Sequence, residues 1–292
     1  MPAKAQKLRV AVTGGSGKIG RETLRALQAA GHQTANFDLR PAPELGRTTI
    51  VDCTDFGQVM SALTGVDLVG GGFDAMVHLA GIPGPGYATD AEVFQGHVLS
   101  TYNVFSACQR LGINRVVWAS SETLMGQPYG APPPFLPVDE SLSRPEWSYS
   151  LAKQLGETMA DTFVRWSPRM SITSLRFSNV FAAEDYANLP SIQQRPESRR
   201  LNLWGYVDAR DCGAACQLAV EAALPGHEAL IIAADDTLLD VDSSELAARF
   251  FPDTPVRGRL EGRQALLSIE KAKRMLGYAP RHTWRDETRG RS

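Results

Sequence analysis

Residues 8–31 have the sequence LRVAVTGGSGKIGRETLRALQAAG, and this stretch decides the fold. The apolar run at 8–13 predicts a short buried strand. Residues 21–30 place apolar side chains at helical spacing, and Gly31 follows as a glycine that ends a helix would. A strand, a glycine-rich turn and a helix in this order predict the first unit of an alternating α/β fold.

The turn between this strand and helix contains the pattern G-x-x-G-x-x-G, formed by Gly14, Gly17 and Gly20. This spacing permits a tight turn, close approach of the backbone to a pyrophosphate, and close packing of helix on strand. The first N–H groups of the helix, at Lys18 and Ile19, would then face the phosphates with a partial positive charge. Glycine is common before any helix, but the strand before and the helix after favour a dinucleotide site over a purely structural turn.

Asp38 ends the second predicted strand, and its carboxylate can accept hydrogen bonds from both ribose hydroxyls of an adenosine. The same charge repels a 2′-phosphate, so Asp38 favours NAD over NADP. Arg40 leaves NADP open, because an arginine at this place can bind a 2′-phosphate. Asp52 and Cys53 end the third predicted strand and are expected near the adenine, with a simple turn after the strand as the alternative.

The alternation of strands and helices continues along the chain. Further strands are predicted at 33–38, 75–79, 115–120, 171–177 and 229–233, and helices at 56–63, 93–111, 149–166, 211–223 and 243–251, the last with Ser243 as N-cap. Irregular loops are expected at 127–145 and 182–200, which are rich in Pro, Gly or polar residues. Short links between strands and helices predict an α/β fold, a doubly wound parallel sheet of Rossmann type.

The later pieces of the pattern are too few for an independent domain. We expect an NAD-binding domain at 1–178 and a small C-terminal substrate lobe at 179–292. Residues 206–224 are expected to return to the large domain.

Composition excludes several functional classes. The net charge of −2 gives no reason to expect a nucleic acid or an anionic membrane as partner. No stretch has the roughly 18–20 consecutive apolar residues of a membrane span, and the start does not resemble a signal peptide. Cys212 and Cys216 are four residues apart without a second pair, so we expect no metal site. Four cysteines in regular apolar segments indicate reduced thiols and a cytoplasmic protein.

Tyr149 and Lys153 lie one turn apart at the start of a predicted helix, so they share a face. Tyrosine, with a pKa of about 10, is a poor base at neutral pH, but a neighbouring ammonium and a nicotinamide cation both favour the phenolate. The pair could therefore act as an acid–base group. Ser120 and Ser121 end the preceding strand, where a hydroxyl can bind a substrate oxygen or simply cap a turn. Ser121 completes the predicted catalytic set.

These residues together resemble the extended short-chain dehydrogenase/reductase family, in its NAD-dependent epimerase/dehydratase branch. The matching pieces run in family order: TGGSGKIG (13–20), VHLAG (77–81), WASSETLMG (118–126), YSLAK (149–153), LRFSNV (175–180), YVDARD (206–211) and SIEKAKRMLGYAP (268–280). The resemblance implies an enzyme of carbohydrate metabolism and a homodimer paired through the helices 93–111 and 149–166.

The resemblance also implies roles for single residues. Tyr149 would be the acid–base group, Lys153 would bind the nicotinamide ribose, and Ser121 would orient the reacting oxygen. The segment 77–81 adds three residues to the cofactor-binding set, Leu79, Ala80 and Gly81. Asn179 matches a position that often faces the substrate.

Departures from the family pattern bear on the substrate. His97 stands where the family usually has an Asn near the active site, and Met125 where sugar-nucleotide epimerases often have a Tyr. The short chain is similar to the uronate dehydrogenases, in which an arginine five residues before a tryptophan holds the substrate carboxylate. Arg199 stands five before Trp204, although it could also be a surface arginine. The expected substrate contacts are Ser121, Glu122, Asn179, Arg199 and His97.

The sequence therefore predicts an NAD-dependent oxidoreductase that acts on a hydroxyl of a small carbohydrate, a sugar or sugar acid. One alternative is a nucleotide-sugar epimerase that holds its NAD tightly. Another is a family member that only senses NAD(H) without catalysis, although the intact Ser–Tyr–Lys set argues against it.

Overall fold

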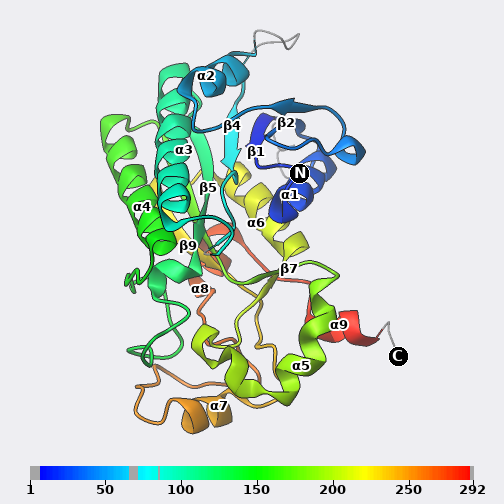
Figure 1. The fold of residues 1–292 in the computed structure, drawn as a ribbon, viewed down its shortest axis with the longest axis vertical. Coiled ribbons are helices and arrows are strands. Elements are labelled where there is room, and N and C mark those ends of the chain that lie inside the picture. The colour runs from blue at the N-terminus through cyan, green and yellow to red at the C-terminus, as the bar shows by residue number, and fades with distance from the viewer. Residues whose placement is uncertain (1–6, 66–71, 85, 290–292) are drawn as a thin grey trace, which may run out of the picture.

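The computed structural model describes residues 7–65, 72–84 and 86–289 (Figure 1). Its centre is a seven-stranded parallel sheet in the order β3-β2-β1-β4-β5-β6-β9. The strands are β1 (Arg9–Thr13), β2 (Gln33–Asp38), β3 (Thr48–Ile50), β4 (Ala75–His78), β5 (Arg115–Ser121), β6 (Ser171–Phe177) and β9 (Gly226–Ile232). The strand order reverses between β1 and β4, which confirms the predicted doubly wound fold. In such sheets ligands bind at the carboxyl ends of the strands beside this point.

Helices cover both faces of the sheet. On one side α1 (Lys18–Ala29) packs against α6 (Ala209–Ala222), and on the other α2 (Phe56–Thr64) and α4 (Ser148–Trp166) pack against α3 (Asp90–Leu111). Successive side chains of a strand point to opposite faces, so each strand supplies both cores. Val117 of β5 belongs to the core under α6, whereas its neighbours Val116 and Trp118 belong to the core under α3 and α4.

One predicted helix start and one predicted N-cap are wrong. The first helix begins at Lys18 rather than at 21, directly after the glycine turn. The helix α7 (Ser243–Phe250) is capped by Asp242, whose carboxylate accepts from the Ser244 N–H, and not by Ser243. Ser243 instead donates its hydroxyl hydrogen to the carbonyl of Gln264 at 2.6 Å.

The expected loop at 182–200 is largely helical. It contains η3 (Asp185–Asn188), α5 (Leu189–Gln194) and η4 (Pro196–Asn202). Pro190 and Pro196 lie in the first turns of α5 and η4, where a missing N–H does not interrupt helical hydrogen bonds. The prolines that suggested a loop therefore start two short helices.

More of the C-terminal chain returns to the large sheet than the predicted 206–224. The strand expected at 229–233 is the end of β9, which pairs in parallel with β6 and puts Leu175 beside Leu230. The predicted placement of this strand in the small lobe is wrong, because Leu230, Ile231 and Ile232 are fully buried in the sheet. The loop 127–145 lies against the C-terminal segment through bridges such as the one between Val138 and Leu267.

The remaining elements are short and lie partly in the large domain and partly in the small lobe. They are η1 (Pro43–Leu45), η2 (Glu122–Met125), β7 (Val180–Phe181), β8 (Val207–Asp208), α8 (Glu270–Leu276) and α9 (Trp284–Arg289), with β7 and β8 paired in parallel. Within the described ranges, no helix has both the length and the apolar character that a membrane crossing requires.

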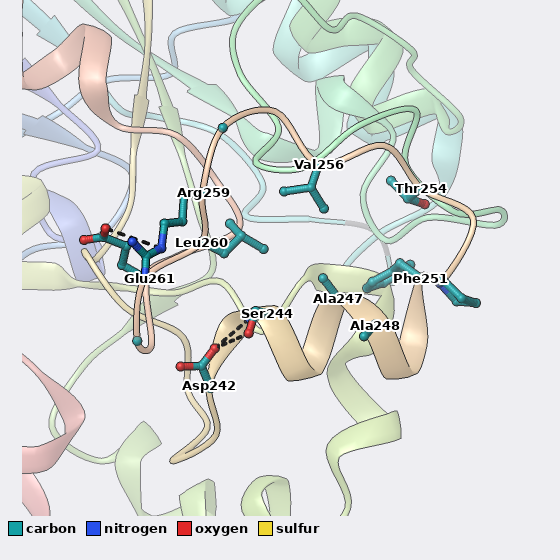
Figure 2. Close-up of a pocket in the computed structure, with 13 residues that line it drawn as sticks. Asp242, Ser244, Ala247, Ala248, Phe251, Thr254, Val256, Arg259, Leu260 and Glu261 are labelled. Atoms are coloured by element: carbon teal, nitrogen blue, oxygen red, sulfur yellow. Dashed lines mark hydrogen bonds and ion pairs between the residues drawn. The ribbon is translucent and has the colours of Figure 1, made fainter.

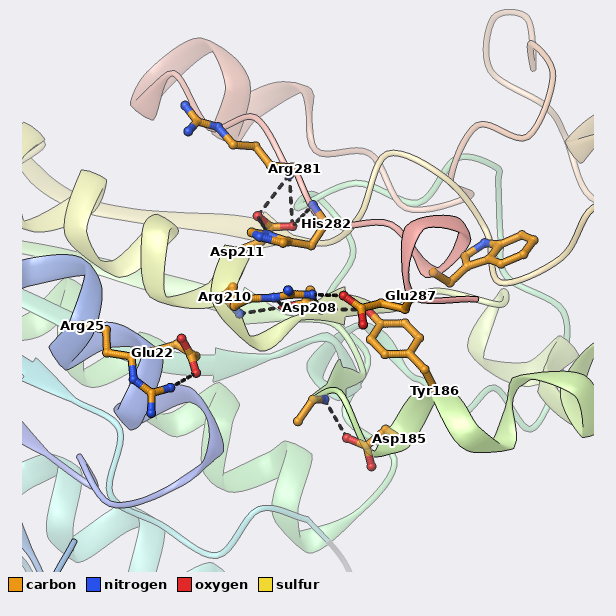
Figure 3. A network of polar contacts seen from close by, with 12 residues as sticks. Glu22, Arg25, Asp185, Tyr186, Asp208, Arg210, Asp211, Arg281, His282 and Glu287 are labelled. Carbon is orange, nitrogen blue, oxygen red and sulfur yellow. Dashed lines mark hydrogen bonds and ion pairs between the residues drawn. The ribbon is translucent and has the colours of Figure 1, made fainter. Parts of the chain in front are cut away.

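A polar network holds the segment 281–287 against α6 and the small lobe (Figure 3). Arg210 binds Asp208 at 2.7 Å and Glu287 of α9 at 2.5 Å, and the Tyr186 hydroxyl of η3 donates to Asp208. The carboxylate of Asp211 accepts the backbone N–H groups of Arg281 and His282 at 3.0 Å. These contacts hold η3, α6 and the C-terminal segment together.

Candidate functional site

The glycine turn leaves no room for a side chain at Gly14 or Gly20. Gly14 has a φ of 70°, and a Cβ there would lie 2.5 Å from the Ala80 nitrogen. A Cβ on Gly20 would lie 2.1 Å from the Gly14 carbonyl oxygen. Among the described residues no side chain caps α1 behind Gly17, so its first N–H groups face the turn without a side-chain acceptor. The turn thus fits the pyrophosphate of a dinucleotide.

Asp38 lies directly beside this turn. Its carboxylate accepts the Ser16 N–H at 3.0 Å and the Arg40 N–H at 3.0 Å. The half-buried carboxylate is therefore held at the end of β2, at the place where an adenosine ribose would meet it.

Asp52 and Cys53 follow β3 after a gap, because that strand already ends at Ile50. The Asp52 carboxylate accepts the N–H and the hydroxyl of Thr54 at 2.8 and 2.7 Å, so it organises the local turn. Cys53 is buried, and burial raises the pKa of its thiol to about 12. Their position near an adenine stays a prediction.

Lys18 connects the glycine turn with the small lobe. Its ammonium lies 2.5 Å from the Asp185 carboxylate of η3 and donates to the Val180 carbonyl at 3.3 Å. The sequence does not predict this contact, since the two segments are far apart along the chain.

The segment after β4 connects the glycine turn with the Tyr149 region. Ala80 contacts Gly14, and a Cβ on Gly81 would lie 2.4 Å from the His97 ring. The His97 ring then meets the Tyr149 ring edge-on, with centroids 5.1 Å apart. Leu79, the third residue expected there, is half-buried and donates its N–H to the Thr13 carbonyl at 3.0 Å.

His97 is buried as a neutral ring. Burial and the charge of Lys153 lower its pKa to about 3. Its Nε2 lies 2.8 Å from the Ile82 carbonyl oxygen, so this nitrogen carries the hydrogen and donates it. His97 therefore does not titrate near neutral pH, a point that the sequence leaves open.

Lys153, Tyr149 and Ser121 meet at the end of β5. Lys153 donates to the Ala119 carbonyl at 2.6 Å and its Nζ lies 5.5 Å from the Tyr149 ring centroid. Ser121 accepts the N–H and hydroxyl of Thr123 at 3.2 and 3.0 Å, and it also hydrogen-bonds to Tyr149. The sequence left two roles open for Ser121, and its hydroxyl has contacts for both: it caps the turn at Thr123 and it is a partner of Tyr149.

Burial governs the protonation of Tyr149 and Lys153 in the protein without cofactor. Burial raises the pKa of Tyr149 to about 12, and the hydrogen bond with Ser121 opposes this only in part. Burial lowers the pKa of Lys153 to about 7, against the charge of Glu157. Burial therefore keeps Tyr149 protonated at neutral pH in the protein without cofactor, and an acid–base role of the pair with NAD bound stays a prediction.

A buried ion pair next to Lys153 was not predicted from the sequence. Glu157, one turn beyond Lys153 on α4, accepts the Ser120 hydroxyl at 2.6 Å. Arg176 of β6 donates to both oxygens of the same carboxylate at 2.9 and 2.7 Å. Ser120 and Ser121 point to opposite faces of β5, so only Ser121 reaches Tyr149. Lys153 and Glu157 are four residues apart on one helix, and this spacing could have predicted that Glu157 lies beside Lys153.

A second polar group lies where η2, the β6–β7 connection and η4 approach each other. Glu122 is buried, and it accepts the Ser178 hydroxyl at 2.5 Å and the Asn179 N–H. Burial raises the pKa of Glu122 to about 7, although the charge of Arg199 acts in the opposite direction. Asn179 is half-buried beside this carboxylate.

Arg199 is not the surface arginine that the sequence left as an alternative. Its Nε and Nη2 atoms are buried, and within the described part of the chain neither has a hydrogen-bond partner. Burial lowers the pKa of its guanidinium and the charge of Glu122 opposes this effect. Buried donors without a partner are rare in folded proteins, so this guanidinium fits an incoming acceptor.

Gln127 and Tyr129 extend this polar group and were not predicted. In the described ranges, the Gln127 Oε1 and the Tyr129 hydroxyl are buried and lack a partner. Both residues are fixed to η4, because Gln127 donates to the Asn202 carbonyl at 3.3 Å and the Tyr129 N–H donates to the Leu201 carbonyl at 2.9 Å. They lie in the loop 127–145, where no helical or strand periodicity indicates which side chains point into the site.

A large surface hollow lies away from these residues. It has a volume of about 790 Å³ and is formed between α7 and residues 251–262 (Figure 2). Its lining includes Asp242, Phe251 and Leu260 and none of the residues predicted for the site. The hollow therefore does not bear on the predicted chemistry.

A Ser–His–Asp chain elsewhere in the fold has the connectivity of a nucleophilic triad. The His227 ring joins the Ser174 hydroxyl at 2.8 Å to the Asp161 carboxylate at 2.8 Å. Ser174 is completely buried within β6, so no substrate can reach its hydroxyl. The chain connects α4 with the edge strand β9 and is structural.

Comparison with known proteins agrees with the fold. The model of the NAD-dependent epimerase/dehydratase family matches residues 10–232. The chain is 28% identical over 257 residues to an L-arabinose 1-dehydrogenase (NAD(P)(+)) of Haloferax volcanii, covering 84% of this chain and 96% of that protein. It is 27% identical over 230 residues to UDP-glucose 4-epimerase 3 of Oryza sativa subsp. japonica, covering 67% and 59%.

Solved structures share the fold. A short-chain dehydrogenase/reductase superfamily protein of Agrobacterium tumefaciens with bound NAD superposes with a TM-score of 0.71 at 23% identity, covering 97% of this chain and 95% of that one. A UDP-glucose 4-epimerase of Stenotrophomonas maltophila with bound NAD and formylated UDP-arabinopyranose gives 0.72 at 19%, covering 97% and 96%. These findings confirm the predicted resemblance and the predicted cofactor, NAD: the chain belongs to the NAD-dependent epimerase/dehydratase family.

Proposed function

We propose that this enzyme is an NAD-dependent dehydrogenase that oxidises a hydroxyl of a sugar or sugar acid. The observation that carries the proposal is the meeting of Ser121, Tyr149 and Lys153 at the end of β5. The contacts from Gly14 through Ala80 and from Gly81 through His97 support a cofactor that reaches this group from the glycine turn.

Each residue of the group has a distinct task in this proposal. Tyr149 accepts the proton of the substrate hydroxyl, and Ser121 holds the same oxygen by a hydrogen bond. Lys153, fixed by the Ala119 carbonyl, stabilises the phenolate and holds the nicotinamide ribose. NAD, when bound, supplies the hydride acceptor and a positive charge that favours the phenolate.

Gly14, Gly17 and Gly20, with the Lys18 and Ile19 N–H groups, are the proposed pyrophosphate site, and Asp38 the proposed ribose site. Asp52, Cys53 and the segment 79–81 complete the proposed cofactor contacts.

The substrate side of the site supports a carbohydrate. Arg199 offers buried donors without a partner, which suit a carboxylate or ring hydroxyls. Glu122, Asn179 and His97 are the further proposed contacts. The relative from Haloferax volcanii is named for oxidation of a sugar, L-arabinose, and it matches this chain along most of its length.

Formation of NADH tests the proposal directly. Purified protein and NAD would be supplied with aldoses, uronic acids and UDP-sugars in parallel, and NADH absorbance would be followed. We expect NADH with a free sugar or uronic acid, and much slower NADH formation with Tyr149→Phe. No NADH with any sugar or sugar acid would remove the proposal.

A nucleotide-sugar epimerase is the second candidate. Similarity to UDP-glucose 4-epimerases from several organisms favours it. It requires NAD that stays bound through purification and a UDP-sugar that changes configuration without net NADH. Protein that loses its NAD on gel filtration would count against this candidate.

The outer faces of α3 and α4 support a homodimer. Large apolar side chains are exposed there, among them Leu99 and Tyr102 of α3 and Leu151 and Trp166 of α4. We propose that two copies pair through this surface, which light scattering of the purified protein would test. Leu99→Glu with Leu151→Glu should then give a monomer.

We also propose that the protein works in the cytoplasm, where its four cysteines stay reduced. All four are buried and free.

A further inference from the structure

Glu122 and Arg199 have opposite charges, and each shifts the pKa of the other, but they do not form an ion pair with each other. Glu122 is bound by Ser178 and Asn179 instead. Among the described residues no ion pair joins the two, and the Nε and Nη2 of Arg199 are without acceptors. The guanidinium therefore keeps donors for a ligand while a buried carboxyl lies near it.

The charge balance of this buried group depends on the ligand. One guanidinium and one carboxylate sum to zero, so a neutral sugar leaves the group balanced. A sugar carboxylate adds a second negative charge for the same guanidinium. Unbalanced buried charge is costly, and a carboxyl in such a place takes up a proton instead.

Glu122 is the group suited to take this proton. Its pKa of about 7 lies close to neutral pH. Among the described residues, Arg199 and two phenols, Tyr129 and Tyr149, interact with it, and the charge of Glu122 raises the pKa of both phenols. Arg144 acts on Tyr129 in the opposite direction. Both phenols are therefore already protonated at neutral pH. Lys153 interacts with Glu157 rather than with Glu122.

We propose that Glu122 determines specificity by letting Arg199 bind a sugar carboxylate only together with a proton on Glu122. A neutral sugar, by contrast, binds with Glu122 ionised and accepting a hydrogen bond from a sugar hydroxyl. The inference rests on the proposed function. It adds that the pH decides whether the site favours a charged or a neutral sugar.

The direction of the pH effect follows from linkage. A bound carboxylate raises the pKa of Glu122, so affinity for a uronic acid is full below the pKa of the free protein. It falls as the pH rises above that value, by about tenfold per pH unit until the pKa of the complex is reached. Affinity for the matching neutral sugar lacks this dependence.

Calorimetry of the NADH-loaded protein with glucuronate and glucose tests the inference. Titrations in buffers of different ionisation enthalpy give the number of protons taken up. About one pH unit above the pKa of Glu122, we expect close to one proton per glucuronate and none per glucose. With Glu122→Gln, proton uptake and the pH dependence of glucuronate affinity should both disappear.

If the Glu122→Gln protein does not fold, a second variant still tests the inference. Ser178→Ala removes a hydrogen bond that lowers the pKa of Glu122, so glucuronate affinity should begin to fall at a higher pH. Glucuronate that binds without proton uptake would overturn the inference, and so would uptake that persists in Glu122→Gln. If neither ligand binds and no sugar is oxidised, the proposed function itself fails.

Discussion

Replacing Glu157 by Gln tests how the buried ion pair supports the active site. The carboxylate accepts from Ser120 and, through both oxygens, from Arg176, and all three side chains are buried. Removing one partner of a buried pair costs about 3–5 kcal/mol, because the other charge stays uncompensated. Arg176 keeps two carbonyl acceptors, Glu140 and Leu142 at 3.0 and 3.2 Å. We therefore expect a loss near the lower end, about 3 kcal/mol.

Urea unfolding of the purified protein measures this loss. The matched control is Glu228→Gln, which breaks the half-exposed pair with Lys271 and should cost less than about 1 kcal/mol. The double variant Glu157→Gln with Arg176→Met removes both charges and should recover most of the stability. A single variant no less stable than the control, or a double variant that recovers nothing, would refute the reasoning.

The same variant should change the pH profile of the reaction. The charge of Glu157 raises the pKa of Lys153, so its removal lets Lys153 lose its proton at lower pH. If protonated Lys153 is needed to stabilise the Tyr149 phenolate, the alkaline limb of kcat/KM moves to lower pH. Glu228→Gln should leave that limb in place.

Further substitutions test the remaining parts of the site. Tyr149→Phe should lower kcat by about 100- to 10,000-fold with little change in NADH binding, measured by steady-state kinetics and NADH fluorescence, and an unchanged kcat would contradict an acid–base role. Gly14→Ala places a Cβ 2.5 Å from Ala80 N at a φ of 70°, so NADH binding should be lost in a fluorescence titration; retained affinity would contradict the close fit. Asp38→Asn should raise kcat/KM for NADP relative to NAD, and an unchanged ratio would mean that this carboxylate does not select the cofactor.

Local patterns predicted the large domain well. The strand 33–38 and the strand 171–177 have the predicted bounds, and Phe56 and Leu63 lie in the predicted helix. Patterns near proline were less successful, because Pro190 and Pro196 open short helices that the composition of the segment concealed. Proline excludes only helix interiors, and sequence alone does not say whether it opens a helix or interrupts one.

Spacing along the chain was enough to predict the alternating fold, the glycine turn and the shared face of Tyr149 and Lys153, because each depends on one or two neighbouring elements. Only the tertiary structure decided that Ser120 binds Glu157, that burial sets the pKa of Tyr149, and that Arg199 of η4 lies near Glu122. Contacts between distant segments and removal from water have no period along the chain. They arise only when the sheet and the small lobe pack together.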